Sequence, residues 1–272
     1  MMAAQNPMPG RKPDRRRAKG RRMSCTAMVR GAALVALAWY ILAFAVSGPI
    51  VPYPHEAAYQ LVQSFLHGNM HLHLLSSLYR VAGGLFLALF FGIPVGLAAG
   101  RNRALDGFIS PFLYLLYPLP KIAFLPVFMV LLGIGDASKI VLIAVIIFFP
   151  MAVNVRDHTR RISREYGILI EAFHIGGREV IRDILLPGVL PGIFASLRIT
   201  IGISLSVLFV SENFATTYGL GYSIMNSWIM ADYTGMYASI LLLSLLGLLL
   251  YLLLDRMENL CLPWLREGWD AE

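Results

Sequence analysis

The chain has little charge, two cysteines and no phosphate-binding loop. Of its 272 residues only 14% are Asp, Glu, Lys or Arg, whereas soluble domains carry roughly 25%. The cysteines show no spacing typical of a disulfide framework or a metal site, so we expect no metal. Because the G-x-x-x-x-G-K-[ST] pattern is absent, the chain does not bind ATP by that route. No paired carboxylates or Ser/His constellation converge in its apolar segments, so we expect no catalytic residues.

Long apolar segments are what the chain has in place of charge. Hydrophobic residues make up 57% of it, and residues 31–55, 81–100 and 233–254 contain no Asp, Glu, Lys or Arg. A transmembrane helix needs about 20 such residues. We therefore expect an all-α, polytopic integral membrane protein with about six transmembrane helices. The expected spans lie near residues 31–49, 81–99, 107–132, 139–155, 189–210 and 236–254.

The net charge of +7 is distributed unevenly between the two sides of the membrane. With the N-terminus in the cytoplasm, 19 of the 23 Lys and Arg residues face inwards, which is the positive-inside bias of membrane proteins. On this topology Arg80 and Lys139 lie outside, whereas Lys121 and Arg198 fall within spans. We therefore expect both termini to lie in the cytoplasm.

The first 30 residues form a basic arm, a composition that is also typical of nucleic-acid binding. Its position before the first apolar segment favours a cytoplasmic anchor, and we expect no nucleic-acid partner. Ala43-Phe44-Ala45 resembles a signal-peptide cleavage site. Because five later spans would still need a membrane, we interpret the first span as a retained signal-anchor. The chain then divides into this arm (1–30), a transmembrane domain (31–255) and a cytoplasmic tail (256–272).

Prolines interrupt the third span. Pro118, Pro120 and Pro126 lie in one apolar stretch that also contains Lys121. Broken backbone at membrane depth is tolerated where it is buried in protein or lines a water-filled cavity, and an ionisable residue there usually faces a pathway. We predict that Pro118, Pro120, Lys121 and Glu212 belong to a translocation pathway or its gate. The alternatives for Lys121 are a snorkelling side chain and an ion pair with Glu212.

The one long polar stretch between spans runs from residue 156 to residue 187 and falls on the cytoplasmic side. Its apolar residues follow helical spacing on either side of Gly176-Gly177, which predicts two short amphipathic helices. A hairpin of this kind (about 157–187) would project into the cytoplasm as a docking surface. The alternative is a helix that lies on anionic lipid.

This segment resembles the cytoplasmic loop of the permease subunits of ATP-binding-cassette importers, which carries the EAA motif. The pattern is Glu171-Ala172-Phe173, then Gly177, then Ile184-x-Leu186-Pro187. It departs from the family in having Phe173 in place of Ala. The stretch from Gly177 to Pro187 is also about three residues shorter than usual, close to one helical turn. The resemblance implies an ATPase-coupling site at Glu171, Ala172, Gly176, Gly177, Ile184, Leu186 and Pro187.

Other segments resemble the nitrate, sulfonate and taurine branch of these permeases, namely residues 118–126, 132–139 and 211–222. The resemblance implies a transmembrane pathway subunit, not an enzyme, that imports a small anionic solute across the bacterial inner membrane. Implied partners are an external solute-binding protein, two ATP-binding-cassette ATPase subunits, a second permease copy in a homodimer, and membrane lipid. ATP and Mg are expected on the ATPases, with no cofactor on this chain.

Two other function classes are alternatives to an importer subunit. An ion-coupled secondary transporter would use intramembrane titratable groups, for which Glu212 and Lys121 are the candidates, and usually has internal repeats. A membrane-embedded enzyme would need a constellation of reactive side chains. Substrate-stimulated hydrolysis by a co-purifying ATPase distinguishes the importer from both.

Overall fold

The computed structural model describes residues 25–46 and 48–264, and the chain divides into two units, residues 1–47 and 48–272. The described part of the first unit is a single helix, α1 (Cys25–Val46). Its segment Val29–Val46 is long and apolar enough to cross a membrane. Residues 1–24 of the predicted basic arm and residues 265–272 of the predicted tail lie outside the described residues.

Within the described residues the protein is all-α, as predicted, and no strand occurs there. Five helical segments are long and apolar enough to span a membrane, and a bent pair of shorter helices brings the number to six. The prediction of about six spans is therefore confirmed. The observed ends of the spans differ from the predicted ends, and one of these differences affects the candidate functional site described below.

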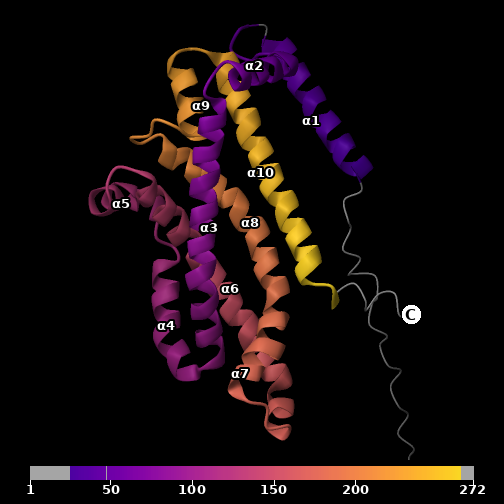
Figure 1. Ribbon diagram of the computed structural model, residues 1–272, viewed down its shortest axis with the longest axis vertical. Helices are drawn as coiled ribbons and strands as arrows, with labels where there is room; N and C mark the ends of the chain where they lie inside the picture. Colours follow the sequence, from indigo (N-terminus) through magenta and orange to yellow (C-terminus); the bar gives the residue numbers. More distant parts are fainter. Residues whose placement is uncertain (1–24, 47, 265–272) are drawn as a thin grey trace, which may run out of the picture. The chain divides into compact units, whose positions relative to one another are not determined.

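The second unit is built on long helices that run side by side (Figure 1). Its helices include α2 (Pro54–Leu66), α3 (Met70–Arg101), α6 (Asp136–Ala172), α8 (Leu186–Glu212), α9 (Leu220–Ile229) and α10 (Tyr233–Cys261). The α3–α6 pair has the most extensive contact, and α6 in turn packs on α8. Helix α10 packs against α2, α8 and α9.

Glycines allow α3 to approach α6 closely. A Cβ on Gly96 would lie 2.6 Å from Cβ of Val155, and one on Gly100 would lie 2.5 Å from Cβ of Thr159. Small residues at four-residue spacing have this effect in membrane helices, where contact between backbones is a main source of association. The α3–α6 pair is thus tightly packed, and its relative position cannot shift without displacing these side chains.

The third span is broken, as its prolines predict. Helix α4 (Arg103–Leu116) is followed by residues 117–120, a 3-10 turn, η1 (Lys121–Phe124), and helix α5 (Leu125–Leu132). The chain bends by 87° at this break. Pro120 directly precedes η1 and Pro126 lies in the first turn of α5, where a missing N–H costs little.

The segment between the fourth and fifth spans differs from the expected pair of short helices. Helix α6 continues without interruption for 37 residues to Ala172. A turn at residues 173–176 follows, then α7 (Gly177–Glu179), the π-helix η2 (Val180–Leu185), and α8. In this turn His174 has the left-handed φ of 51°, whereas Gly176 has a φ of −61°. The predicted hairpin is present, but its first half is the end of a long helix.

Candidate functional site

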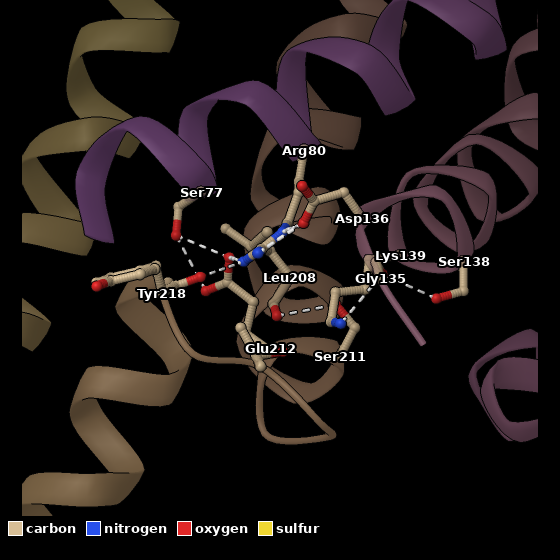
Figure 2. Close-up of polar contacts among 12 residues, drawn as sticks. Ser77, Arg80, Gly135, Asp136, Ser138, Lys139, Leu208, Ser211, Glu212 and Tyr218 are labelled. Carbon is tan, nitrogen blue, oxygen red and sulfur yellow. Dashed lines mark hydrogen bonds and ion pairs between the residues drawn. The ribbon is translucent and has the colours of Figure 1, made fainter. Parts of the chain in front are cut away.

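A cluster of charged side chains lies where α3, α6 and α8 meet (Figure 2), and all of its members are buried except Asp136, which is exposed. We call it the Arg80 cluster and define it by its members Ser77, Arg80, Asp136, Lys139 and Glu212. Arg80 lies on α3, Asp136 begins α6, and Glu212 ends α8. The Arg80 guanidinium donates to Glu212 Oε1 at 2.6 Å, to Asp136 Oδ1 at 2.7 Å and to the Tyr218 carbonyl at 2.8 Å. One cation therefore joins three helices and the loop after α8.

The Glu212 carboxylate has no exposed surface, yet both of its oxygens are satisfied. Ser77 Oγ lies 2.8 Å from Oε1 and 3.0 Å from Oε2, and the Gly221 backbone N–H donates to Oε2 at 2.8 Å. A buried carboxylate is tolerated when it is paired with a cation and hydrogen-bonded. Removal of a partner would leave that charge uncompensated.

Gly219 brings the loop between α8 and α9 onto this cluster. A Cβ at this position would lie 2.5 Å from Glu212 Cδ and 2.7 Å from Arg80 Nη1. His73 of α3 holds the same residue, with Nδ1 at 2.9 Å from the Gly219 carbonyl oxygen and 3.1 Å from its nitrogen. Because no side chain fits there, glycine is required by the close approach.

Arg80 and Lys139, which the predicted topology puts on the outer side of the membrane, are buried inside the protein. Their residues are 5% and 1% exposed. Helix α3 begins at Met70, eleven residues before the expected span at 81, so Arg80 falls inside the helix. Lys139 Nζ donates to the Gly135 carbonyl at 3.2 Å, one residue before Asp136. Both cations are stable there because carboxylates of the cluster offset their charge.

Lys121 lies at the break of the third span, where Pro118 and Pro120 are exposed. Its ammonium donates to the Tyr117 carbonyl at 2.7 Å and lies 4.6 Å from the centroid of the Phe149 ring. A cation at the C-terminus of α4 also interacts favourably with the helix dipole.

The alternative of an ion pair between Lys121 and Glu212 is wrong. Glu212 pairs with Arg80, and Lys121 makes no ion pair with any residue in 25–46 or 48–264. The structure therefore separates the four predicted pathway residues into two places. Pro118, Pro120 and Lys121 lie at the break, and Glu212 lies in the buried cluster. Their role in a pathway stays a prediction.

A second buried ion pair joins α4 to α6 and was missed at the level of sequence. Arg156 Nε donates to Asp106 Oδ1 at 2.5 Å, and Arg160 Nη2 lies 3.2 Å from Asp106 Oδ2. Ser110 Oγ donates to the same carboxylate at 2.6 Å. The sequence feature that could have indicated this pair is the single acidic residue Asp106 in the first turn of an apolar helix. Its partners, Arg156 and Arg160, are four residues apart on another helix.

The predicted coupling residues all lie on the hairpin formed by the end of α6, α7, η2 and the start of α8. Glu171, Ala172, Gly176, Gly177 and Leu186 are exposed, whereas Ile184 and Pro187 are half-buried. Large apolar side chains are exposed on the same hairpin, with Ile168 at 83% and Phe173 at 75%. Clustered exposed apolar groups of this kind mark interaction sites.

Comparison with known proteins identifies the family. Residues 92–267 match the family model described as binding-protein-dependent transport system inner membrane component. The chain is 30% identical over 239 residues to the taurine transport system permease protein TauC of Escherichia coli K12, covering 86% of this chain and 87% of that protein. It is 28% identical to the putative aliphatic sulfonates transport permease protein SsuC of Bacillus subtilis 168, covering 80% and 79%.

The fold is also found in a solved structure. A chain of the MetNI methionine ABC transporter, in an inward-facing conformation, superposes with a TM-score of 0.58 at 22% identity, covering 71% of this chain and 97% of that chain. The family model and the similarity to TauC confirm the sequence-based resemblance. The chain belongs to the binding-protein-dependent inner membrane components, the permease subunits of ATP-binding-cassette importers.

Proposed function

We propose that this permease forms the pathway by which partner ATPases drive a small anionic solute, of taurine or sulfonate type, from an external binding protein into the cytoplasm. The observation that carries the solute class is the 30% identity over most of the chain to a taurine permease. The proposed complex contains two copies of this chain, two ATPases that hold ATP and Mg, and the binding protein. Membership of the family argues against an ion-coupled secondary transporter.

The hairpin supports the proposed ATPase contact. Ile168 and Phe173 are exposed near the exposed Glu171, so the hairpin offers both apolar and charged side chains, as protein interfaces do. Phe173 stands where the family usually has Ala, and it adds apolar area to the contact. We expect the hairpin to carry motion of the ATPases into α6 and α8, which it joins.

The distribution of arginines supports the proposed orientation. The turn from α3 to α4 lies at the same end of the second unit as α7 (Figure 1) and carries Arg101 and Arg103. The arginines from Arg156 to Arg182 belong to the second half of α6 and to the hairpin. Positive residues concentrate on the cytoplasmic side of membrane proteins. The hairpin end is therefore cytoplasmic in this proposal, and the Arg80 cluster lies towards the outer face.

The two groups of predicted pathway residues have different proposed roles. Pro118, Pro120 and Lys121 lie at an irregular break, where a polar lining is tolerated, and Lys121 attracts the anion. Glu212 acts indirectly, because its buried carboxylate holds α3, α6 and the α8–α9 loop together through Arg80. We propose that opening of this contact accompanies opening towards the binding protein.

A pyrimidine is the second candidate solute. The formylaminopyrimidine transport permease protein ThiX of Halalkalibacterium halodurans is 30% identical over 192 residues, covering 71% of this chain and 77% of that protein. The test uses the complex reconstituted in vesicles with its binding protein. Taurine or an alkyl sulfonate should stimulate ATP hydrolysis and enter the vesicles. Stimulation by formylaminopyrimidine alone would contradict the anionic solute and favour the second candidate.

A matched pair of variants tests the ATPase contact in the same assay. Phe173→Ser should lower ATPase co-purification and uncouple hydrolysis from uptake, because it removes apolar area from the hairpin. Leu260→Ser removes an equally exposed side chain, 80% exposed on α10, and should leave both unchanged. Wild-type coupling in Phe173→Ser would contradict docking through this face.

A further inference from the structure

A groove of about 770 Å³ lies where α3 turns into α4, against the π-helix η2. Its apolar walls come from three separate elements, with Pro94 and Leu97 on α3, Leu105 on α4, and Ile181 on η2. Arg101 and Arg103 also line it, and no acidic residue does. The groove therefore combines an apolar interior with a positive end.

The two arginines differ in what they already bind. Arg101 Nη1 donates to the Gly177 carbonyl at 3.0 Å, which ties the end of α3 to the hairpin. Arg103 is exposed and makes no ion pair with any acidic side chain in the described parts of the chain, 25–46 and 48–264. Its guanidinium is therefore available to an anionic ligand, which it would bind through two N–H groups.

The position of the groove at the end of an apolar span indicates which class of anionic ligand it binds. Pro94 and Leu97 lie inside an apolar span, whereas Arg101 is its last residue and Arg103 begins the next helix. A ligand that fills the groove thus has its charge at the membrane surface and its apolar part at the depth of the acyl chains. Basic pockets between transmembrane helices on the cytoplasmic side bind anionic lipid headgroups. A free phosphate would leave the apolar walls unused.

We propose that this groove binds one anionic phospholipid of the inner leaflet, with its phosphate at Arg103 and Arg101 and an acyl chain along Leu97, Leu105 and Ile181. The proposal rests on the orientation proposed above. A lipid in the groove contacts both the α3–α4 turn and η2, which lies in the coupling hairpin. Occupancy then fixes the hairpin against α3, so that lipid composition sets how firmly the coupling segment is held.

The binding is measured on the full chain in detergent by native mass spectrometry, without ATPases. Phosphatidylglycerol should bind more tightly than phosphatidylcholine with the same acyl chains. Arg103→Gln should lower the apparent affinity for phosphatidylglycerol about fivefold, as expected for one basic residue at a lipid surface. Phosphatidylglycerol should also slow hydrogen exchange in residues 177–185 of the wild type, and less so in Arg103→Gln.

Arg164→Gln is the matched control, because Arg164 is another exposed arginine of the same side that lies outside the groove. It should bind phosphatidylglycerol as the wild type does. Equal losses in both variants would show diffuse surface charge and overturn the site, as would wild-type affinity in Arg103→Gln. Displacement of the lipid by sn-glycerol 3-phosphate would overturn it in favour of a free phosphate. Because this experiment measures lipid binding and no transport, a negative result would contradict the lipid site and leave the transport proposal standing.

Discussion

The Arg80 side chain makes polar contacts with several separate elements. Its guanidinium contacts two carboxylates and a backbone carbonyl on separate elements. A guanidinium presents five N–H donors in a fixed planar fork, so it can satisfy all three at once. A lysine at this position would offer one ammonium group on a shorter side chain. It would not fix the positions of α6 and α8 relative to each other.

Removal of one member of the buried pair should destabilise the protein more than removal of both. Arg80→Met leaves Glu212 buried without its cation, a change that costs about 3–5 kcal/mol. The double variant Arg80→Met/Glu212→Met should recover part of this loss, because no charge is left unpaired. The measurement is thermal unfolding in detergent. A double variant less stable than Arg80→Met would contradict this account. Arg161→Met, which breaks an exposed pair with Glu165, should change little.

Gly219→Ala tests the close approach of the α8–α9 loop. Its new Cβ would meet the Glu212 carboxyl carbon and the Arg80 guanidinium, both of which are held by other bonds. We expect a loss of stability on the order of 1–3 kcal/mol, as for overpacking of a core, together with lower transport. Gly202→Ala is the control, since nothing lies within 4 Å of its new Cβ. Similar unfolding temperatures for the two variants would show that the loop can move away freely.

Lys121 should act in transport through its charge. Lys121→Met keeps a chain of similar length without the ammonium, whereas Lys121→Arg keeps the positive charge. If the ammonium attracts the solute, solute uptake by vesicles should fall in the order wild type, Arg variant, Met variant. ATPase co-purification should stay unchanged in all three, because Lys121 lies at the break of the third span and not on the hairpin. Equal uptake by wild type and Lys121→Met would leave Lys121 as a cap of α4.

At the scale of elements, the coupling hairpin shows which kind of inference fails on sequence alone. Glycines often take the left-handed conformation in turns, but neither Gly176 nor Gly177 does so here, and among the described residues Gly133 is the glycine with positive φ. The left-handed residue of the hairpin is His174. A Cβ at Gly177 would meet the Arg101 guanidinium, the far end of a flexible side chain. The backbone path of this turn depends on where α6 ends, which residue types do not determine.

His174 is therefore the position at which a substitution should strain the hairpin backbone most. His174→Val places a β-branched residue at a φ of 51°, which costs on the order of 1–3 kcal/mol. It should lower ATPase co-purification and substrate-stimulated hydrolysis. His174→Gly fits the same backbone without strain and should retain both, and Gly177→Val should be milder than His174→Val. Normal coupling in His174→Val would mean that the turn does not need this conformation.

Elements defined by long apolar runs and prolines were predictable, whereas elements defined by charge pairing were not. The six spans and the break near Lys121 follow from hydropathy and from the missing N–H groups of proline. The start of α3 was misplaced because a charge such as Arg80 normally ends a span. Its partner Glu212 lies 132 positions away, and no local pattern shows that the two charges cancel.

At the scale of the whole molecule, the orientation is the property most open to a direct test. Reporter domains fused after Arg103, Arg164 and Glu272 should report the cytoplasm, and a reporter after Tyr59 should report the outside. The reason is the concentration of Lys and Arg near the first three sites. An external signal at Arg164 would invert the topology, and it would remove the hairpin from reach of cytoplasmic ATPases.

Helix α6 has a mechanical consequence because of its length. Its 37 residues span about 55 Å, at 1.5 Å per residue, so this single rod is longer than the hydrocarbon core of a bilayer, which is about 30 Å thick. One tip carries Asp136, held to Arg80 at 2.7 Å, and the other carries Ala172 at the hairpin. A tilt of about 5° around the midpoint displaces each tip by about 2.4 Å. That displacement exceeds the tolerance of a hydrogen bond. Because α3 packs tightly on α6, we expect the two helices to tilt together. A tilt of a few degrees at the hairpin, where we propose that the ATPases dock, would then open the contact from Arg80 to Glu212 of α8.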